Sequence, residues 1–89
     1  MEVTVEFLAQ AKVAAGVSSC ELSLEAAARP GELLRRLVAE RPGVAELAPG
    51  NGRPGSILLF VNDEQVDWDA ERAITGGDRV LITSAMSGG

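Results

Sequence analysis

The sequence lacks the side chains on which most enzymes rely. It contains no histidine, no tyrosine and a single lysine, Lys12. Histidine is the commonest general base near neutral pH and the most frequent metal ligand in proteins. Neither a GxxxxGK[ST] phosphate loop nor a GxGxxG motif is present. We therefore expect a protein that is not an enzyme on its own and that binds no metal and no other cofactor.

Few side chains remain as candidates for covalent or acid–base chemistry. The lone Cys20 cannot form an internal disulfide, and in SSCELSLE it alternates with polar residues on the same face as Leu22. That alternation predicts a structural, buried thiol rather than a reactive one. Asp67 and Asp69 flank Trp68 in VDWDAE, which reads as an exposed turn. We interpret them as two solvated carboxylates rather than an acid and base pair.

Long apolar runs and clustered basic residues are also missing. No stretch approaches the roughly 20 apolar residues of a membrane span, and the acidic start MEVTVEF lacks the basic region of a signal peptide. We expect a cytoplasmic protein with no membrane contact. The net charge is −5 and the eight basic residues are scattered, which argues against nucleic acid and favours a basic protein partner.

The composition that remains is typical of a small globular protein. With 89 residues, 46% of them hydrophobic, the chain suits one domain over residues 1–89. Only three aromatic side chains are present, Phe7, Phe60 and Trp68. Aliphatic side chains must therefore build most of the core.

The first third of the chain predicts two strands. EVTVEFL alternates with Val3, Val5 and Phe7 on one face, the pattern of a half-buried strand. AQAKVAAG then reads as a short connection, after which SCELSLE returns as a second strand. An antiparallel pair is the simplest arrangement of the two.

One amphipathic helix of about three turns is predicted in RPGELLRRLVAERPG. Pro30 suits the first helical turn, and Glu32 and Arg36 are spaced for an ion pair on the solvent-exposed face of the helix. Pro42 with Gly43 ends the helix. The apolar residues that recur at helical spacing are Leu33, Leu34, Leu37 and Val38.

The second half of the chain supplies the remaining strands. Residues 42–55 read as a surface loop with one helical turn, and SILLFVN is apolar on both faces, as a central strand would be. NDEQVDW predicts a tight turn into a short strand, and RVLITS is the last strand. This order predicts an α+β, ubiquitin-like β-grasp fold. Its mixed sheet has four to five strands, with the first and last parallel in the centre, one main helix on one face and the other face open.

Two segments resemble a known family. The opening VEFLAQAK is similar to the signature of the small subunit of molybdopterin synthase, and the part from Leu58, LLFVNDEQVDWDAERAITGGDRVLITSAMSGG, resembles the same family's turns, last strand and terminal Gly-Gly. The resemblance covers nearly the whole chain, although the helix matches in position more than in sequence. It extends to the wider group of β-grasp sulfur carriers.

The resemblance implies a function for the last residues, SAMSGG. Residues 85–89 would form a flexible tail, and an ATP-using adenylating enzyme of the ubiquitin-activating type would activate the carboxylate of Gly89. Sulfur then replaces one oxygen, and the resulting thiocarboxylate donates its sulfur in a complex with the large subunit of molybdopterin synthase. Gly88 and Gly89 suit this role because bare glycines can thread a narrow channel. ATP belongs to the partner enzyme.

A docking surface is predicted on the open face of the sheet. If Val80 and Ile82 face the helix, their neighbours on the last strand point outward, and the third strand presents a second outward group that includes Leu58. The predicted partner-docking residues are Leu8, Phe60, Leu81, Thr83 and Lys12. The alternative is that one strand is out of register and these residues belong to the core. The chain departs from the family pattern at Val13, where an acidic residue is frequent, and at the polar Gln65 and Thr83.

Several functions fit these features. The first is a sulfur carrier for molybdopterin synthesis, which the FLAQAK start favours. The second is a related carrier for cysteine or thiamine synthesis. The third is a ubiquitin-like modifier joined through Gly89 to lysines of other proteins, and the plainest is a binding module whose Gly-Gly end has no role. The fate of the tail separates the modifier from the carriers.

Overall fold

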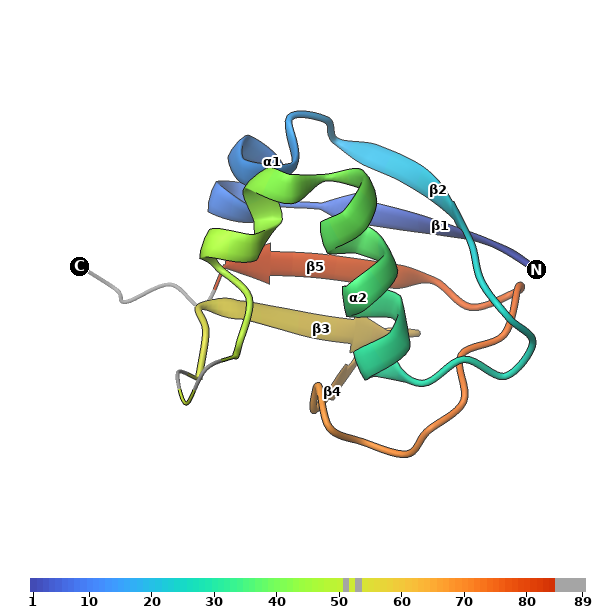
Figure 1. The fold of residues 1–89 in the computed structure, drawn as a ribbon. Coiled ribbons are helices and arrows are strands. Elements are labelled where there is room, and N and C mark those ends of the chain that lie inside the picture. The colour runs from blue at the N-terminus through green and yellow to red at the C-terminus, as the bar shows by residue number, and fades with distance from the viewer. Residues whose placement is uncertain (51, 53, 85–89) are drawn as a thin grey trace.

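The protein is described by a computed structural model that covers residues 1–50, 52 and 54–84. Two strands and two α-helices alternate in the first part of the chain, and three strands follow in the second, as Figure 1 shows. The strands are β1 (Glu2–Phe7), β2 (Ser19–Ser23), β3 (Ile57–Val61), β4 (Glu64–Val66) and β5 (Val80–Ser84). The helices are α1 (Ala9–Ala15), α2 (Pro30–Glu40) and the 3₁₀ helix η1 (Pro42–Glu46).

The strands form one mixed sheet in the order β2-β1-β5-β3-β4. β1 pairs antiparallel with β2 and parallel with β5, and β3 pairs antiparallel with both β5 and β4. The first and last strands therefore lie side by side and parallel, which confirms the predicted topology. β5 is the middle strand, so both of its edges are occupied.

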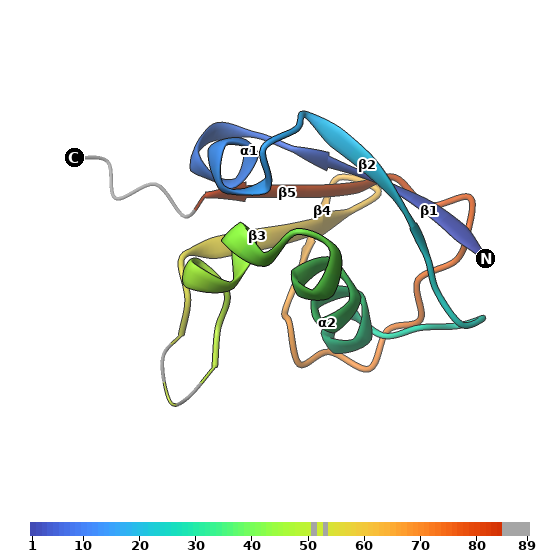
Figure 2. The same ribbon diagram turned by 45° about the horizontal axis from the view of Figure 1, so that its top comes forward.

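Helix α2 crosses one face of this sheet, and Figures 1 and 2 show it lying over the central strands. Its residues Leu33 and Leu37 are fully buried and share one hydrophobic core with Leu59 and Ile82 of the sheet. Pro30 stands at the start of α2 and Pro42 follows its end, as predicted. Burial of the leucine stripe against the sheet is the main reason that this helix is stable.

On the solvent-exposed side of α2, one ion pair differs from the prediction. Arg36 pairs with Glu40, at 2.8 Å between guanidinium and carboxylate, rather than with Glu32. The Glu32 carboxylate instead accepts a hydrogen bond of 3.0 Å from the backbone N–H of Arg29. Glu32 is therefore used as a helix cap, which satisfies an amide that would otherwise lack a partner.

Helix α1 is a second difference, because the sequence predicted only a connection there. The segment is rich in alanine, the best helix former, and ends at Gly16, which has a φ of 81° and donates its N–H to the carbonyl of Lys12. Only two of its residues are buried, Ala11 and Ala15. Such small side chains leave no apolar periodicity in the sequence, so the pattern did not indicate this helix.

The segment after α2 packs closely against α1. It forms the single 3₁₀ turn η1, which confirms the expected turn within a loop, and buries Val44 in the core. A Cβ atom on Gly43 would overlap the carbonyl oxygen of Ala14. Glycine is therefore required where this segment meets α1.

The turn between β3 and β4 is tied to the start of β5. Asn62 and Asp63 have φ values of 53° and 68°, as a two-residue hairpin turn demands. The Asn62 amide donates to the Asp78 carboxylate and accepts from the Arg79 N–H, both at 2.9 Å. Asp78 also accepts the Thr75 N–H at 2.8 Å. This backbone hydrogen bond, and secondly that from Asn62, lower the pKa of the Asp78 carboxyl below its ordinary value of 3.8.

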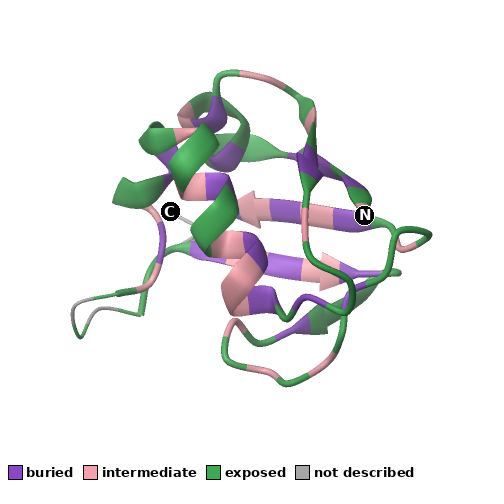
Figure 3. Cartoon of the chain, turned by 45° about the vertical axis from the view of Figure 1, so that its right-hand side comes forward, coloured by how far each residue is buried: buried purple, intermediate pink, exposed green. Residues whose placement is uncertain are grey.

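Burial alternates along the strands, as the colours of Figure 3 show. In β1 the residues Val3, Val5 and Phe7 are buried while their neighbours are exposed, which confirms the predicted faces of this strand. Among the residues that the structure describes, no helix is long and apolar enough to cross a membrane.

Candidate functional site

The side chains that point away from the helices form an apolar group on β3 and β5. Phe60 and Leu81 are register partners on these two strands, and so are Leu58 and Thr83. All four are only partly buried, whereas the residues that alternate with them lie in the core. The predicted register is therefore right, and the alternative that these residues belong to the core is wrong.

Leu8 joins this group at the end of β1. Its N–H donates to the Ile82 carbonyl at 2.9 Å, so the pairing with β5 continues one residue past Phe7. The Leu8 side chain is 50% exposed, and Val13 on α1 is 71% exposed. In the sequence Val13 stands out only as a departure from the family pattern, because an isolated valine in an alanine-rich segment carries no signal of exposure.

Lys12 lies on α1 and not on the sheet. Its side chain is exposed, and its N–H donates to the Leu8 carbonyl at 3.4 Å. The structure therefore brings Lys12 within one helical turn of Leu8. Among residues 1–50, 52 and 54–84, no hydrogen bond or ion pair joins Lys12 to β3 or β5.

The other half of the open face is acidic. Glu2 and Glu6 of β1 and Glu21 of β2 are exposed, and Glu6 is the register partner of Leu81. None of these three carboxylates belongs to an ion pair among residues 1–50, 52 and 54–84. The open face therefore passes from apolar on β3 and β5 to negatively charged on β1 and β2.

The end of β5 is held by side-chain contacts that the sequence analysis missed. Ser84 is buried, and its hydroxyl oxygen accepts a hydrogen bond of 3.2 Å from the N–H of Ala11 in α1. Ser84 is the register partner of Ile57, whose carbonyl accepts the indole N–H of Trp68 at 2.9 Å. A serine in a strand gives no sequence signal of a partner 73 residues away.

The predicted reactive residues, Gly88 and Gly89, and the whole predicted tail over 85–89 lie outside the described residues. Ser84 directly precedes this segment. The apolar group therefore lies beside the end of the central strand β5, after which the sequence of the predicted tail begins.

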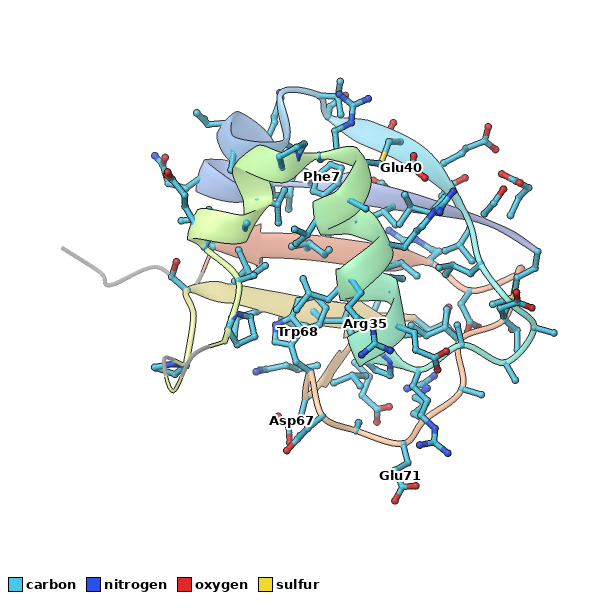
Figure 4. The ribbon with its side chains drawn as sticks, viewed as in Figure 1. Phe7, Arg35, Glu40, Asp67, Trp68 and Glu71 are labelled. Carbon is cyan, nitrogen blue, oxygen red and sulfur yellow. The ribbon has the colours of Figure 1, made fainter. Side chains whose placement is uncertain are left out.

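The sequence predicted a buried Cys20 and two exposed aspartates; the structure confirms the aspartates but buries Cys20 only in part. Cys20 is half-buried against the core, and burial raises the pKa of its thiol above the ordinary value of 9.0, although the nearby Arg41 acts in the opposite direction. The thiol is therefore protonated at neutral pH and is a poor nucleophile. Asp67 and Asp69 are exposed on either side of Trp68, and Figure 4 shows Asp67 at the periphery.

Comparison with solved structures finds the same fold in several other proteins. SAMP1 from Haloferax volcanii superposes with a TM-score of 0.85 at 21% identity over 100% of both chains. A Pyrococcus furiosus protein described as subunit 1 of a molybdopterin converting factor gives 0.80 at 24% identity, over 97% of this chain and 99% of its own. A chain in the BexX/CysO complex of Amycolatopsis orientalis gives 0.70 at 25% identity, over 98% and 99%.

These likenesses establish the fold as the ubiquitin-like β-grasp, with a mixed sheet of five strands and two helices. No curated protein sequence matches the chain. The model of the ThiS family, however, matches residues 5–89, which is most of the chain and includes the two terminal glycines. The chain therefore belongs to the ThiS family of ubiquitin-like sulfur carriers.

Proposed function

We propose that this protein is a sulfur carrier whose reactive group is the carboxylate of Gly89. The observation that carries the proposal is the position of the open apolar group, Leu58, Phe60, Leu81 and Leu8, beside the end of β5. A half-exposed apolar surface of this kind suits docking onto another protein. Docking there would bring the residues after Ser84 to the partner enzyme.

The proposed chemistry begins with an unactivated anion. A terminal carboxyl has a pKa of about 3.5, so it is ionised at neutral pH and resists attack by nucleophiles. In the first step a carboxylate oxygen of Gly89 attacks the α-phosphorus of ATP, and pyrophosphate leaves. In the second step hydrosulfide attacks the carbonyl carbon of the acyl adenylate, the bond to the AMP oxygen breaks and AMP leaves. The product is a thiocarboxylate.

In this scheme the chain supplies the carboxylate and the docking surface, and the adenylating enzyme supplies ATP and the catalytic groups. The absence of histidine from the sequence agrees with such a division. We further propose that the sulfur is passed to a pterin precursor within a complex with a molybdopterin synthase large subunit. The FLAQAK start and the likeness to the Pyrococcus furiosus protein support this assignment.

The same activated carboxylate could be used in two other ways. A carrier for cysteine or thiamine synthesis would donate its sulfur to a different acceptor, and the likeness to a chain of the BexX/CysO complex supports a carrier outside molybdopterin synthesis. In a protein modifier, a lysine amine would attack the acyl adenylate in place of sulfur and form an isopeptide bond. The likeness to SAMP1 concerns the fold alone. The chemical fate of the Gly89 carboxylate must therefore distinguish a sulfur carrier from a protein modifier.

Intact-protein mass spectrometry tests the proposal. We expect the chain, incubated with its adenylating partner, ATP and hydrosulfide, to gain the mass of one sulfur in place of one oxygen, localised to Gly89. Deletion of Gly89, or addition of one residue after it, should abolish the gain, because one residue moves the carboxylate by about 3.3–3.6 Å. Thermal stability should not change in either variant.

The acceptor is identified by a second experiment in cells. Recovery of the chain with a molybdopterin synthase large subunit, and loss of molybdopterin when Gly89 is deleted, would assign the pathway. A covalent adduct between Gly89 and a lysine would support the modifier function. If the intact chain never gains sulfur with a competent partner and the Gly89 deletion leaves the pathway working, the carrier function is wrong.

A further inference from the structure

The one polar residue that is buried among the described residues is Ser84, the last residue of β5. Its hydroxyl oxygen accepts the N–H of Ala11 at 3.2 Å, and this hydrogen bond is itself buried. Ala11 lies in the first turn of α1, where backbone N–H groups have no partner within the helix. Ser84 therefore satisfies an amide of α1 and at the same time anchors the end of β5.

Contacts from β3, on the other side of strand β5 from β1, hold the same residue. Ser84 is paired in register with Ile57, the first residue of β3. The Ile57 carbonyl accepts the indole N–H of Trp68 at 2.9 Å, and Trp68 also lies half-buried against the core, near α2 in Figure 4. We name this connected set, Ala11, Ser84, Ile57 and Trp68, the tail-root clamp.

The tail-root clamp lies at the end of β5, and the proposed function requires that the position of this end be fixed. Five residues follow Ser84, and they can reach at most about 17 Å when fully extended. If the end of β5 were released, the point from which these five residues extend would shift by about one residue length. A displacement of about 1 Å at a reacting group can already reduce a rate strongly.

We propose that Ser84 is a positioning residue, whose hydroxyl, bonded to the Ala11 amide, fixes the point from which the terminal segment reaches the adenylating partner. The inference rests on the proposed function, which it deepens. Docking through the open face brings the two proteins together, and the clamp sets where the carboxylate then arrives. Loss of the hydroxyl should therefore reduce turnover more than it reduces binding.

The experiment compares variants of the full chain in steady-state adenylation by the ubiquitin-activating-type partner. Ser84→Ala removes the acceptor, and Ser84→Cys keeps the size but offers a weak acceptor. Both should lower kcat about five- to tenfold, the effect of losing one buried hydrogen bond, while KM for the carrier changes less than twofold. Ser84→Thr keeps the hydroxyl, and its kcat should stay close to that of the wild type.

Ser23→Ala is the matched control. Ser23 also lies in a strand and also uses its hydroxyl in a hydrogen bond, to the Glu2 carboxylate, but at the opposite end of the sheet. Its loss should leave kcat unchanged. If Ser84→Ala folds poorly in thermal melts, Ser84→Cys provides the comparison at nearly constant volume.

Amide hydrogen exchange gives a readout that needs no partner. The Ala11 amide should exchange faster in Ser84→Ala than in the wild type or in Ser23→Ala. A wild-type kcat in Ser84→Ala and Ser84→Cys, or a loss explained by KM or by the unfolded fraction, would overturn the positioning role while leaving the carrier function intact. If the wild type is never adenylated, the carrier function fails and the positioning role falls with it, whatever the exchange data show for the hydrogen bond.

Discussion

The two faces of the sheet are made by the same strands and have opposite properties. In β3 the side chain of Leu59 is fully buried against α2, whereas the adjacent Phe60 lies half-exposed on the open face. In β5 the buried Ile82 stands next to the half-exposed Leu81. Residues that stabilise the fold and residues that are available for a partner therefore alternate one by one along the chain.

This difference means that substitutions at adjacent positions should have separable effects. A change on the covered face should reduce the free energy of unfolding, and a change on the open face should reduce affinity for a partner. Experiments on neighbouring residues can therefore test whether the separation is real.

The largest expected effect is that of Leu59→Ala. Truncation of this buried leucine leaves a cavity between the sheet and α2, and should lower the free energy of unfolding by about 2–5 kcal/mol. Urea denaturation of the purified chain would measure it. Leu58→Ala, one residue earlier on the open face, is the control and should cost clearly less. Equal losses at both positions would contradict the separation of the two faces.

Gly43→Ala should have the next largest effect, also on the covered side. The added Cβ would overlap the Ala14 carbonyl oxygen and force η1 away from α1, at a cost of about 1–3 kcal/mol. The melting temperature should fall accordingly. Gly77→Ala is the control, because no atom lies within 4 Å of the position that its Cβ would take. A wild-type melt for Gly43→Ala would show that η1 and α1 are not closely packed.

The alternation of the strands could be predicted because it is a local property. Val3, Val5 and Phe7 occupy every second position of β1, and the pleat alone puts them on one face. The same rule placed Leu81 and Thr83 outward on β5. Long apolar stripes such as that of α2 are equally clear, because burial of the stripe both stabilises the helix and marks it in the sequence.

The features that escaped prediction depend on contacts between distant residues. α1 has only alanines on its buried side, so its place is set by Gly43 and Ser84 rather than by its own pattern. Glu32 could reach Arg36 or the amide of Arg29, and spacing alone cannot decide between them. The Ser84 hydrogen bond likewise follows from the tertiary structure and has no local signature.

On the open face, Phe60→Glu should weaken docking of the adenylating partner at least tenfold. A charge in the middle of the apolar group must be desolvated when the partner binds, whereas in the free protein it remains in contact with water. Isothermal titration calorimetry would measure the affinity, and the stability should change by no more than about 1 kcal/mol. Loss of folding would instead place Phe60 in the core and contradict the assignment of the faces.

The smallest expected effect lies at the turns between strands, away from both faces. Asp78 has its pKa lowered, first by the Thr75 backbone N–H and then by the Asn62 amide, so its ionised form favours the folded state. A lowered pKa contributes stability above the unfolded value near 3.8, and this contribution disappears as the pH falls through the folded value. Asp78→Asn should therefore be less stable than the wild type at pH 5–7, by less than about 1 kcal/mol because the carboxylate is solvated, and the two should converge only as the pH falls from 3.8 through the lower folded-state value. Urea denaturation at several pH values would measure the difference. A gap that persists at low pH would mean that the substituted amide side chain disturbs the turn by its shape, and not by the loss of charge.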